Sequence, residues 1–66
     1  MTVDELGERI NEFGHVTDVF EHAANRMFIR SIHAQLKEGG VWGWPAACEI
    51  YRKVGDGFEL VESRRS

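Results

Sequence analysis

The chain has little of what usually stabilises a very small protein. It contains one cysteine and one proline among 66 residues, so no disulfide can form within the chain. A domain of this size buries only about 60% of its unfolded surface, and disulfides, metals or a second subunit commonly add stability. The single cysteine also favours a reducing compartment. We therefore expect one cytoplasmic domain over residues 1–66, stabilised as a homodimer.

Long apolar runs are missing as well. No stretch approaches the roughly 20 apolar residues that a membrane-spanning helix needs. The first ten residues, MTVDELGERI, are acidic where a secretory signal would be basic and then apolar. We expect no association with a membrane.

Basic residues do not dominate, because 8 lysines and arginines face 11 aspartates and glutamates, giving a net charge of −3. The excess lies in residues 1–13, where four acids face one arginine, and the remaining charges balance. Chains that bind nucleic acid are usually basic overall. Direct nucleic-acid binding is therefore the less favoured expectation.

A first helix is predicted over about residues 3–13. Thr2 and Glu5 fit a capping box, and Gly14 suits the position after the last turn. Apolar residues recur at steps of three and four: Val3, Leu6, Ile10 and Phe13. Three acids form an acidic stripe on another face: Asp4, Glu8 and Glu12. Gly7 inside the helix costs about 1 kcal/mol against alanine, and it would permit close approach of a second helix.

A second, longer helix is predicted over about residues 17–38, with Thr17 as N-cap and two glycines after its end. The short connection makes the two helices antiparallel neighbours. Apolar side chains cover an arc of about 180°, more than the roughly 100° that one packing partner requires. The other side presents a basic seam: His22, Arg26, Arg30, His33 and Lys37. Two strands over 15–21 and 26–32 are an alternative, and a break near Asn25 is the expected defect.

The C-terminal part predicts strands over about 41–44, 47–54 and 58–62, followed by a frayed tail at 63–66. A three-residue loop would place Lys53 opposite Glu59, whereas a two-residue Asp56-Gly57 turn would place it opposite Leu60. The first register gives this inner face: Cys48, Ile50, Val54, Phe58 and Leu60, with Arg52 as a misfit. The predicted fold is α+β, with two antiparallel helices packed on a hairpin or three-stranded sheet.

Trp42 and Trp44 are two residues apart, so they point to the same face of an extended strand that ends at Pro45. Both indoles could cover the small core, or one could remain exposed as a binding anchor.

Catalytic and metal-binding patterns are weak. His22 and His33 lie some 16 Å apart along a helix, too far to share an ion, and Asp18 with His22 supplies only two ligands. Cys48 is expected to point inward, where a thiol behaves as a small hydrophobe. We expect no enzyme activity, metal or cofactor.

The basic seam has three interpretations. It is a solvated helix face, a partner for the acidic stripe within or between chains, or a surface for nucleic-acid phosphates. The last leads to the alternative function, a winged-helix-like nucleic-acid-binding regulator whose second helix breaks near Asn25 and whose final hairpin is the wing.

The favoured function is a small non-catalytic protein–protein interaction module. Its partner-binding residues would be the acidic stripe, the basic seam and the two tryptophans, and its target a protein such as a nucleic-acid-binding one. In size and style the chain is similar to small inhibitor or accessory proteins of phages and mobile elements, including inhibitors of bacterial defence systems. An inhibitory role is therefore a further expectation.

Overall fold

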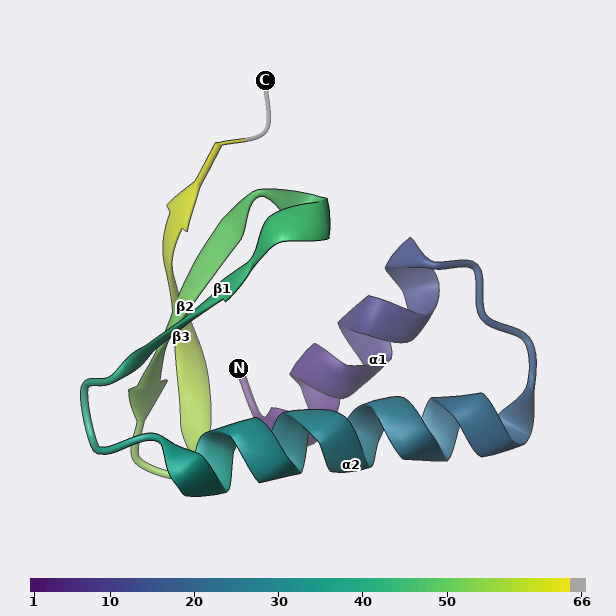
Figure 1. The fold of residues 1–66 in the computed structure, drawn as a ribbon, viewed down its shortest axis with the longest axis horizontal. Helices are drawn as coiled ribbons and strands as arrows, with labels where there is room; N and C mark the ends of the chain where they lie inside the picture. Colours follow the sequence, from purple (N-terminus) through teal and green to yellow (C-terminus); the bar gives the residue numbers. More distant parts are fainter. Residues whose placement is uncertain (65–66) are drawn as a thin grey trace.

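Two helices lead into a three-stranded antiparallel sheet in the computed structural model, which describes residues 1–64 (Figure 1). The predicted α+β class is confirmed. Strands are ordered β1-β2-β3, and the chain passes through a 3-10 helix, η1, between the first two. The elements in chain order are α1 (Val3–Phe13), α2 (Val19–Gln35), β1 (Val41–Trp44), η1 (Pro45–Ala47), β2 (Glu49–Val54) and β3 (Gly57–Ser63).

α1 has the predicted bounds because its caps are local. The Thr2 hydroxyl accepts a hydrogen bond from the Glu5 amide at 3.0 Å, and the Thr2 amide donates to the Glu5 carboxylate at 2.8 Å. Gly7 is buried against α2, where a Cβ atom would lie 2.8 Å from the Arg26 Cα. The missing side chain therefore allows the two helix backbones to come close together.

α2 is continuous, so the break expected near Asn25 does not occur and the two-strand alternative is wrong. Asn25 does not compete with its own backbone, because its amide donates to the Asn11 side chain on α1 at 2.6 Å. The helix is shorter than predicted at both ends. Asp18, not Thr17, is the N-cap and accepts from the Phe20 amide at 2.9 Å, and the last helical residue is Gln35.

Neither predicted hairpin register is correct. Val54 pairs with Gly57 and Lys53 with Phe58, so Gly55 and Asp56 form a two-residue turn. Gly55 has a φ of 58°, the left-handed conformation that such a turn requires and that glycine adopts easily.

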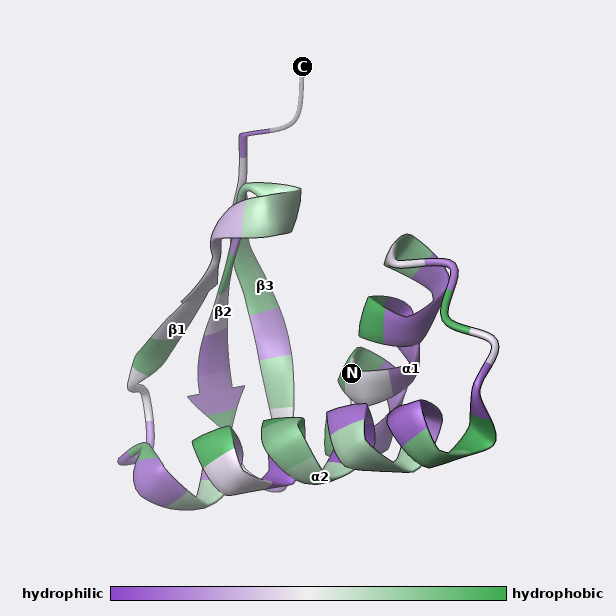
Figure 2. Ribbon diagram, turned by 45° about the vertical axis from the view of Figure 1, so that its right-hand side comes forward, coloured by the Kyte–Doolittle hydropathy of each residue, from purple (hydrophilic) through white to green (hydrophobic). Residues whose placement is uncertain are grey.

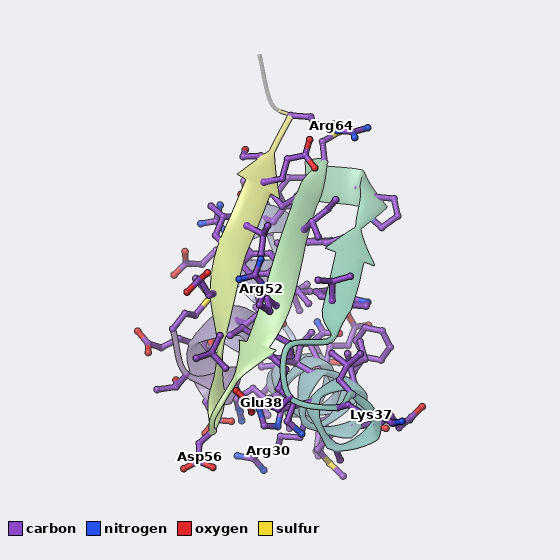
Figure 3. All side chains as sticks on the ribbon, turned by 90° about the vertical axis from the view of Figure 1, so that its left-hand side faces the viewer. Arg30, Lys37, Glu38, Arg52, Asp56 and Arg64 are labelled. Atoms are coloured by element: carbon purple, nitrogen blue, oxygen red, sulfur yellow. The ribbon has the colours of Figure 1, made fainter. Side chains whose placement is uncertain are left out.

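The faces of β2 are also opposite to the prediction. Glu49 and Tyr51 are buried, whereas Val54 is exposed. Arg52 is exposed in front of the sheet in Figure 3 and pairs with Glu59 at 3.5 Å. The register shifts between Ile50 and Tyr51, which is a bulge that alternation alone does not reveal.

The segments around β2 and β3 differ from the prediction too. Cys48, expected to point inward, is exposed and adopts a left-handed φ of 54° after η1. Ser63, assigned to a frayed tail, ends β3, and the Arg64 amide donates to the Cys48 carbonyl at 2.8 Å. The rest of that predicted tail, residues 65–66, lies outside the described part of the chain.

The core lies where the sheet meets the two helices. The sheet and α1 rise from the same side of α2, which leaves the opposite side of that helix uncovered (Figure 2). Met1 extends the edge of the sheet, because its ammonium donates to the Phe58 carbonyl and its carbonyl accepts from the Phe58 amide. The buried apolar residues are Leu6, Ile29, Trp44, Ala47, Tyr51 and Phe58.

Candidate interaction surfaces

The acidic stripe and the basic seam meet between α1 and α2. Arg30 donates to Asp4 through two nitrogens, at 3.0 and 3.1 Å, and Arg26 donates to Glu8. The hydrogen bond from Arg26 is the main reason that the pKa of Glu8 lies below its usual value. Of the three interpretations of the seam, pairing within the chain therefore describes these two arginines.

The other members of the two surfaces have different surroundings. His22 Nε2 lies 2.7 Å from the Val16 carbonyl oxygen, and its Nδ1 lies 4.0 Å from Glu8. His33 belongs to a second contact, since its Nε2 lies 3.0 Å from the Gly55 carbonyl and its ring packs edge-on to a core phenylalanine. Within residues 1–64, the exposed side chains of Glu12 and Lys37 make no hydrogen bond or ion pair.

Lys53 has a structural role that could not be predicted from the sequence. Its ammonium donates to the carbonyls of His33 and Leu36, both at 2.9 Å, and so neutralises the carbonyl end of α2. Close by, the Glu38 carboxylate accepts from the Gly55 amide at 2.9 and 3.0 Å. These bonds fix the end of α2 to the hairpin, and only the tertiary fold brings the partners together.

A buried polar cluster joins α1 to the sheet. Glu49 is 3% exposed, accepts from the Tyr51 hydroxyl at 3.0 Å and receives two bonds from Arg9, at 2.8 and 3.3 Å. Burial is the main cause that raises the pKa of Tyr51, and the hydrogen bond to Glu49 raises it further. Every buried polar side-chain atom in the described residues has a partner. The cluster therefore links α1 to β2 through an ion pair and hydrogen bonds.

The two tryptophans lie on one face, as predicted, but in different surroundings. Trp44 is buried in the core, and Trp42 is half-buried and stacks on it with ring centroids 6.4 Å apart. Trp42 also meets Phe28 of α2 edge-on at 6.3 Å. It therefore borders an apolar surface that the core does not cover.

That surface is the α2 apolar face, formed by Phe20, Ala24, Met27, Phe28 and Ser31. Its large side chains are exposed by 80% at Phe20, 65% at Met27 and 53% at Phe28. At about 100° per residue all five lie within an arc of roughly 100°, on the side of the helix away from buried Ile29. The wide apolar arc indicated a second packing face, but these residues were not among the predicted site residues.

No protein-family model, curated protein or solved structure matches this chain. No group of three or more potential metal ligands occurs in residues 1–64. In the same part of the chain, neither helix has the length and apolar character needed to cross a membrane.

Proposed function

We propose that this chain is a non-catalytic protein–protein interaction module that forms a cytoplasmic homodimer and binds a protein target. The α2 apolar face is the observation that supports this most, because three large apolar side chains are more than half exposed on one helix. A contiguous apolar patch on a folded chain commonly marks a protein interaction site. Half-buried Trp42 beside Phe28 enlarges the patch with an aromatic anchor of the type found at interfaces.

The acidic stripe on α1 is the surface that we propose for the target. Asp4 and Glu8 form ion pairs but stay about half exposed, and Glu12 has no side-chain partner in residues 1–64. A basic surface, such as that of a nucleic-acid-binding protein, would complement these charges and be attracted over a longer range than apolar contacts allow. The inhibitory role expected from the size of the chain stays a prediction.

The winged-helix alternative gains no support. It requires a broken second helix, whereas α2 runs without interruption through Asn25. It also requires free basic side chains, whereas Arg26 and Arg30 already pair with acids of α1. Nucleic-acid binding is therefore not proposed.

Photo-crosslinking in the organism whose genome encodes this chain tests the proposed function. A photoreactive phenylalanine analogue replaces Phe20 on the α2 apolar face, and Asp56 at the tip of the hairpin turn in a matched control. We expect a discrete cross-linked product from position 20, either a second copy or another protein, and none from position 56. Absence of any product from position 20 in a folded variant would contradict the proposal.

A further inference from the structure

Large and small side chains on the α2 apolar face are spaced in a way that suits packing against another helix. Residues four apart form ridges on a helix surface. One ridge is Phe20, Ala24 and Phe28, and the neighbouring ridge is Met27, Ser31 and Gln35. The small side chains of Ala24 and Ser31 alternate with the large ones along these ridges. Gln35 donates to the Ser31 hydroxyl at 3.1 Å, so part of the hydrogen-bonding capacity of these two side chains is met within the helix.

We propose that a second copy of this chain occupies the α2 apolar face, with the two α2 helices antiparallel about a two-fold axis near Met27 and Phe28. This rests on the self-association part of the proposed function. In a symmetric dimer each copy uses the same patch, so a single self-complementary surface is sufficient. With the axis at this place, Ala24 of one copy faces Ser31 of the other, and their small side chains let the helices approach.

Charge at the rim selects the antiparallel direction. Glu21 precedes Phe28 by two turns and lies on the same flank of the apolar face as Phe28. This flank is about 180° round the helix from Arg30. Lys37 comes after the last helical residue, Gln35, and so does not lie in the predicted seam. Figure 3 shows it on the side of α2 opposite Arg30, hence on the flank of Glu21. Both Glu21 and Lys37 are exposed and have no ionic partner in residues 1–64.

An antiparallel pair brings Glu21 of each copy toward Lys37 of the other, giving two equivalent ion pairs. In a parallel pair the corresponding flanks of the two copies would lie on opposite sides of the interface, so neither ion pair would form. The antiparallel arrangement also places the start of each helix, capped by Asp18, beside the end of the other, so that their dipoles attract.

The area available fits a small dimer interface. From their exposed fractions, Phe20, Met27 and Phe28 together expose about 400 Å² per copy, if each full side chain presents on the order of 200 Å². Ala24, Ser31, Gln35 and the charged rim bring the face toward the roughly 800 Å² per partner of a standard interface. The sheet and α1 lie on the other side of α2 and leave this approach open (Figure 2).

Solution mass measures the assembly directly. Sedimentation equilibrium of the wild type should give twice the 7.5 kDa chain mass. Met27→Glu should give a folded monomer, because it buries a charge at the two-fold axis. Val54→Glu, which alters an exposed apolar residue on the sheet, is the matched control and should stay dimeric. A wild type that is monomeric at millimolar concentration would overturn the inference.

Direction and register are tested by disulfide trapping in a Cys48→Ser background. Mixing an Ala24→Cys chain with a Ser31→Cys chain should yield the mixed disulfide, and neither chain should cross-link to itself efficiently. Lys37→Glu should weaken the dimer several-fold, and adding Glu21→Lys to the same chain should restore it. Self-linked Ala24→Cys dimers, or failure of the double reversal, would reject the antiparallel arrangement.

These outcomes separate the inference from the proposed function. If position 20 cross-links to a different protein while the wild type sediments as a monomer, the dimer is wrong and the chain is an interaction module whose apolar face binds that protein. If the wild type is monomeric and position 20 gives no product, both fail.

Discussion

Gly7 sets the distance between the two helices. Replacing it with alanine would place a methyl group 2.8 Å from the Arg26 Cα, which is backbone and cannot rotate away. The gain in helix propensity is about 1 kcal/mol, and forcing packed elements apart typically costs about 1–3 kcal/mol. We expect Gly7→Ala to lower the free energy of urea unfolding despite its better propensity.

Gly43→Ala is the matched control for that variant. An added Cβ at Gly43 meets no atom within 4 Å, so this change should be neutral or slightly stabilising. A Gly7→Ala protein as stable as the wild type would show that α1 and α2 do not pack as closely as described.

The titration of Tyr51 makes the free energy of unfolding depend on pH in the alkaline range. Its folded-state pKa lies above the ordinary 10.0, chiefly through burial, so the neutral phenol stabilises the fold below pH 10. That contribution is lost as the pH rises from 10 through the folded pKa. Tyr51 is the only tyrosine, so tyrosinate absorbance should titrate above 10.0 in the native chain and near 10.0 in urea.

The Tyr51→Phe variant separates this effect from general alkaline unfolding. It should lose about 1–3 kcal/mol at neutral pH, because Glu49 loses a hydrogen bond. The unfolding free energy of this variant should then fall less than that of the wild type between pH 9 and 11, a range of about one pH unit on either side of the ordinary tyrosine pKa. Parallel pH profiles for the two proteins would refute the role given to this hydroxyl.

The bounds of α1 were predictable from residues within its own segment, whereas the faces of β2 depend on distant partners. α1 has its predicted bounds because Thr2, Glu5 and Gly14 lie within its own segment. Alternation misplaced β2 because its inner face carries Glu49 and Lys53, which look like surface residues. Their partners, Arg9 and the last carbonyls of α2, are brought close only by tertiary folding.

The α1–α2 pair gives a prediction at the element scale. Reversing one charge, by Glu8→Arg or Arg26→Glu, replaces attraction between the helices with repulsion. We expect the melting temperature to fall by a few degrees, which is roughly the effect of losing one modest interaction in a small domain. The double reversal should recover most of the loss, because the pair is restored with opposite orientation. Single and double variants that melt alike would show that this ion pair does not couple the helices.

The whole molecule is thin, measuring 32 × 30 × 15 Å along its principal axes. Such a shape encloses few side chains, and the buried apolar set within residues 1–64 is correspondingly small. The sequence could indicate that α2 had more apolar surface than one partner covers, since that depends only on helical periodicity. It could not indicate which part stays uncovered, because that depends on where the sheet packs. Nor could it decide that Asp4 and Glu8 pair within the chain, since a second copy offers the same arginines.

A thin monomer with a small core would gain stability from the proposed association. If the α2 apolar face is buried between two copies, unfolding releases two chains, and each tenfold rise in protein concentration adds about 1.4 kcal/mol per mole of dimer to its stability. We therefore expect the urea midpoint of the wild type to rise with concentration. Met27→Glu should remove this dependence, because the monomer unfolds independently of concentration, whereas Val54→Glu should retain it. A wild-type midpoint that stays constant over a hundredfold range would mean that the chain folds alone and that its apolar face serves a different partner.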